Sequence, residues 1–247
     1  MKTIAIINHK GGVAKTTSTV NIGAGLALKG YNVLLIDADP QANLSQSFGI
    51  FQVEQDIYTA FTKGKSLPIM KVKENLYVVP SSLDFAGIEL EIASRIDRDK
   101  LLAELLEQEQ NKYDYCLIDC PPSLGLITVN ALVASQEIYI PIVAEYLPFK
   151  GIDSIVGFIE KVKKHLNKNL VLKGVFFTRF NSKKVLSKQI NIQIEKSFGS
   201  TLMETVIREN VALAECPSAG IDIFEYDKAS YGAADYEKLV DEILKQK

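Results

Sequence analysis

The stretch INHKGGVAKTTSTVN, residues 7–21, decides the fold, because it carries a short apolar run into a helical pattern through a glycine-containing loop. At a strand–loop–helix junction of this kind, loop N–H groups and the helix N-terminus together bind phosphate oxygens well. The loop fails the strict pattern G-x-x-x-x-G-K-[ST] at both glycine anchors, since His9 stands at the first and Ala14 at the second. The stretch is therefore either a glycine-rich turn with an exposed lysine or a variant phosphate-binding loop.

The residues that remain in the loop favour phosphate binding. Gly11 and Gly12 let the backbone approach an anion without a Cβ atom in the way. The Lys15 side chain would reach the β- and γ-phosphates, and the Thr16 hydroxyl would ligate magnesium. If position 14 requires a positive φ, Ala14 costs on the order of 1 kcal/mol, which weakens the loop without abolishing it.

Strand-like and helix-like segments alternate along the rest of the chain. Runs of successive apolar residues, as in the buried strands of a parallel sheet, occur at 3–7, 32–37, 76–80, 115–119, 137–143 and 172–178. Helical patterns lie between them, for example at 16–30 and 99–110, and another lies near the end. The pattern predicts an α/β fold with a doubly wound, mostly parallel sheet and helices on both faces. Because no linker divides the 247 residues, we expect one domain, 1–247.

Polar clusters follow three of the predicted strands, at 8–17, 37–43 and 119–123. Ligands of doubly wound sheets bind at the carboxyl ends of the strands, so the three clusters should converge on one ligand. Capping of strand ends would explain one of the aspartates Asp37, Asp39 and Asp119 well, but it explains all three poorly.

Three motifs, KGGVAKTT (10–17), DADPQAN (37–43) and IDCPPS (118–123), together resemble those of the deviant Walker A P-loop NTPases, and within them the ParA-type partition ATPases. The resemblance covers essentially the whole chain, including the segment 210–236. In that family the first glycine anchor is not required, and an extra lysine precedes the glycine pair. The resemblance implies that Lys10 crosses a two-fold interface to the ATP of a partner subunit, so that a homodimer holds two nucleotides.

The resemblance also implies two cofactors, ATP and Mg²⁺, and roles for individual residues. Asp39 would orient the attacking water, Asp37 would support the metal shell, and Asp119 would be the Walker B acid that holds magnesium. Residues near 207–211 would frame the adenine, with Asn181 as a second candidate for its edge. The expected catalytic residues are Lys10, Lys15 and Asp39; the metal residues are Thr16, Asp37 and Asp119; the nucleotide-binding residues are Lys10, Gly11, Gly12, Val13, Ala14, Lys15, Thr16, Thr17, Arg208 and Asn210.

Charge is distributed unevenly along the chain, although the formal net charge is only −2. The span 161–194 contains no Asp or Glu and nine basic residues, namely Lys161, Lys163, Lys164, Lys168, Lys173, Arg179, Lys183, Lys184 and Lys188. Such a span suits non-specific DNA binding, which is mainly phosphate neutralisation, although a solvated basic helix face would look the same. The expected DNA-binding residues are Arg179, Lys183, Lys184 and Lys188.

The resemblance implies an ATPase that hydrolyses ATP to ADP and phosphate and drives plasmid or chromosome partition. Its expected partners are a second copy of the chain, non-specific DNA and a ParB-like centromere-binding protein that stimulates hydrolysis. No apolar run approaches the roughly 20 residues that cross a bilayer, so we expect no membrane partner and a cytoplasmic, nucleoid-associated protein.

Four alternatives share parts of this pattern. A MinD-like membrane-cycling ATPase would need an amphipathic helix at the end, where DEILKQK (241–247) offers little apolar face. A ParA-like protein could position a cargo other than DNA. Iron–sulfur carriers of the superfamily need paired interface cysteines, whereas Cys116, Cys120 and Cys216 suit buried thiols. A ligase-like enzyme would need a substrate pocket that the sequence does not identify.

Overall fold

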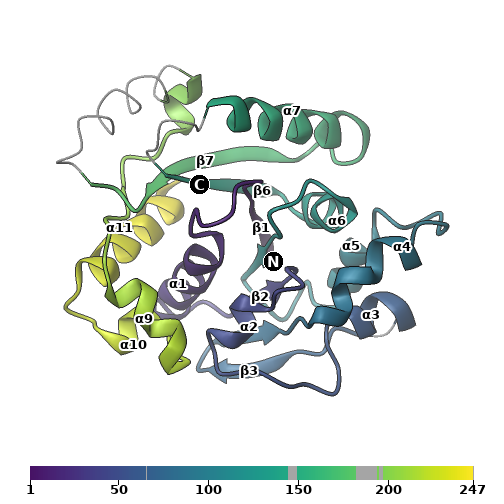
Figure 1. Ribbon diagram of the computed structural model, residues 1–247, viewed down its shortest axis with the longest axis horizontal. Coiled ribbons are helices and arrows are strands. Elements are labelled where there is room, and N and C mark those ends of the chain that lie inside the picture. Colours follow the sequence, from purple (N-terminus) through teal and green to yellow (C-terminus); the bar gives the residue numbers. More distant parts are fainter. Residues whose placement is uncertain (65, 144–148, 182–193, 195–196, 247) are drawn as a thin grey trace.

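The structure, a computed structural model, describes residues 1–64, 66–143, 149–181, 194 and 197–246. Its strands form one sheet in the order β3-β4-β2-β5-β1-β6-β7. All pairings are parallel except that of the edge strand β3 with β4. This confirms the predicted doubly wound, mostly parallel sheet (Figure 1).

The described elements are β1 (Lys2–Ile6), α1 (Lys15–Leu28), β2 (Val33–Asp37), α2 (Asn43–Gln46), α3 (Ile57–Lys63), β3 (Met70–Lys73), β4 (Leu76–Val79), η1 (Leu83–Gly87), α4 (Ile88–Glu91), α5 (Leu101–Glu107), β5 (Tyr115–Asp119), α6 (Leu126–Ala134), β6 (Glu137–Val143), α7 (Phe149–His165), β7 (Val171–Thr178), η2 (Gly199–Thr201), α9 (Ala212–Ala219), α10 (Ile223–Tyr226) and α11 (Tyr231–Lys245). The six strands that the apolar runs predict are all present, with ends that differ by at most one residue.

Two apolar cores cover the two faces of the sheet, because successive side chains of a strand point to opposite faces. In β1, Ile4 and Ile6 belong to the core shared with α1 and α11, whereas Ala5 and the following Ile7 belong to the core shared with α5 and α6. Figure 1 shows α1 and α11 on one side of the sheet and α5 and α6 on the other. Burial on both faces explains why the strand sequences are apolar at nearly every position.

The edge strand β3 was not predicted. It is short, its sequence MKVK is half charged, and its residues are exposed or half-buried. It pairs antiparallel with β4 through a tight turn in which Asn75 has φ 59. A partly polar hairpin strand at a sheet edge lacks the apolar run by which the other strands were recognised.

The last helix, α11, packs its apolar side into the protein. Its residues Tyr236, Leu239, Val240 and Ile243 are buried, and the hydroxyls of Tyr236 and Ser18 in α1 are hydrogen-bonded at 3.0 Å. The apolar face that a membrane-binding helix would present is therefore used in the core. Within the described residues, no helix has the length and apolar character needed to span a membrane.

Candidate active site

The loop between β1 and α1 has a positive φ at Ala14, the strained conformation considered in the sequence analysis. Ala14 is the N-cap of α1 with φ 63 and ψ 35, in the left-handed region, and Gly12 also has a positive φ of 73. The Ala14 carbonyl accepts the first helical hydrogen bond, from Ser18 N at 2.9 Å. Alanine pays a steric penalty here that glycine would not.

Replacing Ala14 by glycine is expected to raise the free energy of unfolding by about 0.5 kcal/mol. Relief of left-handed strain is worth about 1 kcal/mol, and the greater freedom of glycine in the unfolded chain offsets part of that gain. Ala42, the N-cap of α2 with φ 54, is a matched control: Ala42→Gly should stabilise by a similar amount. Urea unfolding measures both, and a destabilised Ala14→Gly protein would contradict the strain argument.

Two side-chain contacts fix the loop to neighbouring strands, and a third holds it internally. The Asn8 side chain donates from Nδ2 to the carbonyl of Pro141 (2.8 Å), and its Oδ1 accepts from Lys10 N (3.0 Å). The Thr178 hydroxyl at the end of β7 donates to the carbonyl of Val13 (3.1 Å). Sequence reasoning did not identify Asn8 or Thr178, because each acts through a strand distant in sequence. The loop is thus held by β6 and β7 before any ligand binds.

Lys15, Thr16 and Asp119 meet beside this loop, as predicted. The Lys15 ammonium donates to the Lys10 carbonyl (3.3 Å), and only 7% of the residue is exposed. The Thr16 hydroxyl donates to Asp119 Oδ2 (2.6 Å). Burial lowers the pKa of Lys15, although the charge of Asp119 raises it, and burial raises the pKa of Asp119 well above its usual value. A bound phosphate would favour the charged form of Lys15, and a bound cation would favour the charged form of Asp119.

Asp37 and Asp39 follow β2 and have different surroundings. Asp37 Oδ2 accepts hydrogen bonds from the Ser45 amide (2.8 Å) and hydroxyl (2.6 Å), and its Oδ1 accepts from Asp39 N (3.2 Å). Asp39 Oδ1 accepts from Gln41 N at 3.0 Å. Asp37 thus holds the loop that carries Asp39, and its predicted part in the metal shell stays a prediction.

The buried Asp37 carboxyl should make stability depend on pH. Burial raises the pKa of Asp37 from 3.8 to about 7, against the hydrogen bonds from Ser45 and Asp39, which lower it. Because the folded state keeps a proton that the unfolded chain has already lost, the free energy of unfolding should fall as the pH rises from about 4 to about 7. Urea unfolding of the nucleotide-free protein should show a shallower fall for Asp37→Asn, and equal slopes would contradict this assignment.

Two connected cavities surround the loop. One, of about 610 Å³, is lined by Lys15, Thr16 and Asp39. The other, of about 450 Å³, is lined by residues 207–211 and parts of β7 and α11. Both cavities share Gly12, Ala14 and Thr17. A polar cavity with a buried lysine that opens into a more apolar one has the arrangement that a nucleotide needs for its phosphates and its base.

Two of the three predicted adenine-binding residues line the base-side cavity. Arg208 lines the base-side cavity, but its guanidinium pairs with Asp235 (Nη2–Oδ1 2.7 Å) and lies over the Tyr231 ring, 4.2 Å from its centroid. Asn210 lines the same cavity, and its Oδ1 accepts from Ala212 N at the start of α9 (2.8 Å). Asn181 is not among the described lining residues. Backbone and side-chain groups of 207–211 remain the predicted frame for a base.

The described basic residues of the acid-free span 161–194 lie at both ends of β7 and within it. Its lysines up to position 168 lie at the end of α7 and beyond, next to the amino end of β7. Arg179 is exposed and follows the carboxyl end of β7, on the side of the loop. The predicted DNA-binding residues Lys183, Lys184 and Lys188 lie outside the described residues.

The cysteines do not form a cluster site. Cys116, Cys120 and Cys216 are buried free thiols, and burial raises the pKa of each. Within the described residues, no group of three or more His, Cys, Asp or Glu side chains could hold a metal ion. Nothing in this part of the chain therefore favours the iron–sulfur alternative.

Sequence comparison finds relatives among partitioning proteins. A family model described as an AAA domain matches residues 1–172. The chain is 42% identical over 247 residues to the sporulation initiation inhibitor protein Soj of Bacillus subtilis, covering 98% of both chains. It is 38% identical over 245 residues to the chromosome-partitioning ATPase Soj of Treponema pallidum, covering 98% of this chain and 97% of the relative.

The fold also occurs in an enzyme of another class. The crystal structure of cobyrinic acid a,c-diamide synthase from Mycobacterium smegmatis with bound ATP analogue and magnesium superposes with a TM-score of 0.88 at 27% sequence identity, over 99% of this chain and 95% of that one. Similarity of fold therefore does not distinguish a partition ATPase from a diamide synthase. The two Soj proteins share more sequence identity with this chain than the synthase does.

Proposed function

Since the chain belongs to the ParA-type partition ATPases of the ParA/MinD superfamily, we propose that it acts as an ATP-driven dimer. The chain is a ParA-like partition ATPase. In our proposal it binds ATP and Mg²⁺, dimerises, binds DNA without sequence preference on the nucleoid, and hydrolyses ATP when a ParB-type partner stimulates it. The observation that carries this proposal is the meeting of Lys15, Thr16, Asp39 and Asp119 at one edge of the sheet.

Each of these side chains has a distinct task in phosphoryl transfer. Lys15 neutralises charge on the β- and γ-phosphates, with help from the amides of the loop and the α1 N-terminus. Thr16 and Asp119, already joined at 2.6 Å, would hold magnesium, which supplies positive charge to the phosphate oxygens. Asp39 orients the attacking water, since its carboxylate lines the same cavity as Lys15.

In our proposal, Lys10 is the residue through which one subunit contacts the nucleotide bound by the other. It is exposed; its backbone amide donates to Asn8 Oδ1, and its carbonyl accepts from the Lys15 ammonium. It is not among the described residues that line either cavity. In our proposal the exposed Lys10 reaches the nucleotide of a facing subunit, where added positive charge stabilises the transferring phosphoryl group.

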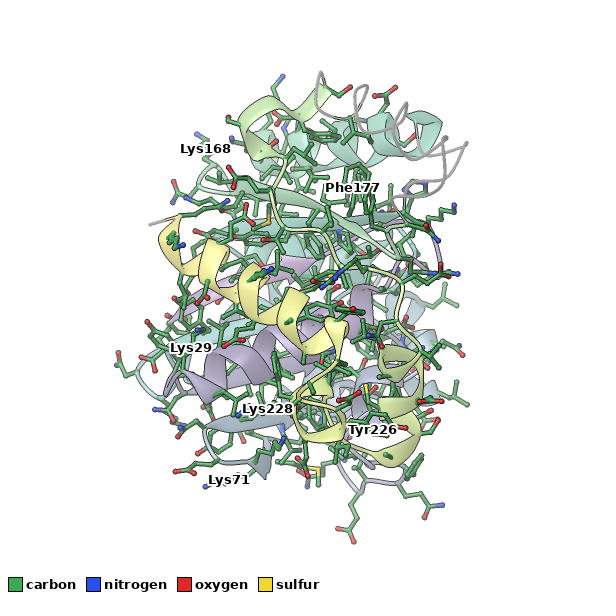
Figure 2. The ribbon with its side chains drawn as sticks, turned by 90° about the vertical axis from the view of Figure 1, so that its left-hand side faces the viewer. Lys29, Lys71, Lys168, Phe177, Tyr226 and Lys228 are labelled. Atoms are coloured by element: carbon green, nitrogen blue, oxygen red, sulfur yellow. The ribbon has the colours of Figure 1, made fainter. Side chains whose placement is uncertain are left out.

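Arg179 should contribute to ATP-dependent DNA binding. Replacing it by alanine is expected to weaken binding and to lower the slope of log K against log salt by about 0.9 for each lost phosphate contact. Lys71→Ala, which removes an exposed lysine from the edge strand β3, is the matched control (Figure 2). Fluorescence anisotropy of a labelled duplex at several salt concentrations measures both, and equal slopes would remove Arg179 from the DNA-binding surface.

The proposal as a whole is tested by ATPase rates with duplex DNA, with a candidate partner, and with both. We expect the largest rate with both, and DNA binding that needs ATP rather than ADP. The proposal would be contradicted if the ATPase rate changed with neither DNA nor the partner and if DNA binding did not depend on nucleotide or salt. A rate that responds to anionic liposomes instead would favour the MinD-like alternative.

A further inference from the structure

A further cavity adjoins the phosphate side of the site. It has a volume of about 630 Å³ and lies between the segments 41–59 and 81–84. It shares Gln41, Gln46 and Phe51 with the cavity that contains Lys15. None of the roles assigned to the active site uses this space, so they do not identify a ligand for it.

The charges that line this cavity are negative. Asp56 is used within the protein, because it accepts hydrogen bonds from the Thr59 amide (3.0 Å) and from the Ser82 hydroxyl. Glu54 and Asp84 are exposed, and among the described residues neither forms an ion pair. No lysine or arginine is among the described lining residues. We call this space the acidic cavity.

Two further features of the acidic cavity indicate a ligand. Phe51 and Leu83 line it and are 76% and 70% exposed, so the cavity offers apolar surface beside its carboxylates. Ser81 also lines it and is only 5% exposed, yet its hydroxyl has no hydrogen-bond partner among the described residues. A buried polar group without a partner is costly, and a bound group that accepts or donates one hydrogen bond would remove that cost.

Hydrogen bonds connect the acidic cavity to the catalytic carboxylate. The Ser81 amide donates to Ser45 Oγ (3.1 Å), and the Ser45 hydroxyl donates to Asp37 Oδ2 (2.6 Å). Asp37 Oδ1 accepts from Asp39 N (3.2 Å). On the other side, Gln41 lines the acidic cavity and its amide donates to Asp39 Oδ1. A ligand that moves the segment 81–84 therefore acts on groups that set the orientation of Asp39.

We propose that the acidic cavity is the docking site of the protein that stimulates hydrolysis, and that it takes a short segment carrying a lysine or arginine beside an apolar side chain. This proposal rests on the proposed function. The cation pairs with Glu54 and Asp84, and the apolar side chain covers Phe51 and Leu83. The docked segment then acts through Ser81, Ser45 and Asp37 on the position of Asp39.

A basic peptide tests the docking site without knowledge of the natural partner. The probe is a fluorescein-labelled peptide of repeated Leu-Lys-Arg units, with repeated Leu-Glu-Glu units as the acidic counterpart. We expect the basic peptide to bind the double variant Glu54→Gln/Asp84→Asn about tenfold more weakly than the unmodified protein. The matched control is Glu74→Gln/Glu107→Gln, which removes the same charge from exposed sites elsewhere and should bind like the unmodified protein.

The same variants separate this inference from the proposed function. The basic peptide should raise the ATPase rate of the unmodified protein and of the control, and should fail to raise that of Glu54→Gln/Asp84→Asn, whose basal rate and ATP-dependent DNA binding stay normal. Equal binding by all three proteins, or no binding to the unmodified one, would overturn the docking site alone. Absence of basal ATPase and of ATP-dependent DNA binding in the unmodified protein would instead overturn the proposed function.

Discussion

Replacing Asp39 by alanine is expected to slow ATP turnover at least about 100-fold, while ATP-dependent dimers still form. Asp39 lines the cavity that contains Lys15 and Thr16, and it is 7% exposed. Its loss removes the carboxylate that would orient the attacking water, but leaves the lysine and the loop amides that bind phosphate. Phosphate release measures turnover, and light scattering in ATP measures the dimer.

Asp39→Asn is the control that separates charge from shape. Asparagine keeps an oxygen that can accept from Gln41 N, so the loop should stay in place, but it removes the negative charge. We expect the same loss of turnover as in Asp39→Ala, with an unchanged melting temperature. Turnover near that of the unmodified protein in either variant would show that another group orients the water.

Replacing Lys10 by alanine is expected to weaken the ATP-dependent dimer at least about 100-fold. Each dimer would lose two charge-assisted hydrogen bonds to phosphate, and each such bond contributes about 1.5–3 kcal/mol. Nucleotide binding by the monomer should survive, because Lys15 and the loop amides remain. Sedimentation at several protein concentrations in a non-hydrolysable ATP analogue gives the dimer dissociation constant.

Two variants control for the loss of a lysine as such. Lys71→Ala removes an exposed lysine from β3, away from the loop, and should dimerise normally. Lys10→Arg keeps the positive charge and should retain part of the dimer affinity. If Lys10→Ala forms dimers of normal strength, the nucleotide is not held across the interface by this residue.

The sequence predicted the fold well because every central strand is buried on both faces. Such strands are apolar throughout, which makes them visible without knowledge of their partners. The meeting of the loop 8–17 with the aspartates after two other strands was predicted for a similar reason, since the carboxyl ends of neighbouring parallel strands must lie together. The β-pairing confirms this placement by aligning Asp37 with Asp119.

The features that the sequence did not predict depend on contacts between distant segments. The pairing of Arg208 with Asp235 and the hydrogen bonds of Ser45 to Asp37 have no signature in spacing. The basic span is continuous in sequence, yet β7 lies between Arg179 and the lysines at the end of α7. Likewise, the acidic cavity joins segments 41–59 and 81–84, which lie on different strand connections.

The most direct test is a crystal structure with a non-hydrolysable ATP analogue and magnesium. If the dimer is the working form, two subunits related by a two-fold axis enclose two nucleotides, and Lys10 Nζ of each lies within hydrogen-bonding distance of the γ-phosphate held by its mate. A nucleotide contacted by one subunit alone, with the Lys10 side chains directed into solvent, would contradict the sandwich and the partition cycle derived from it.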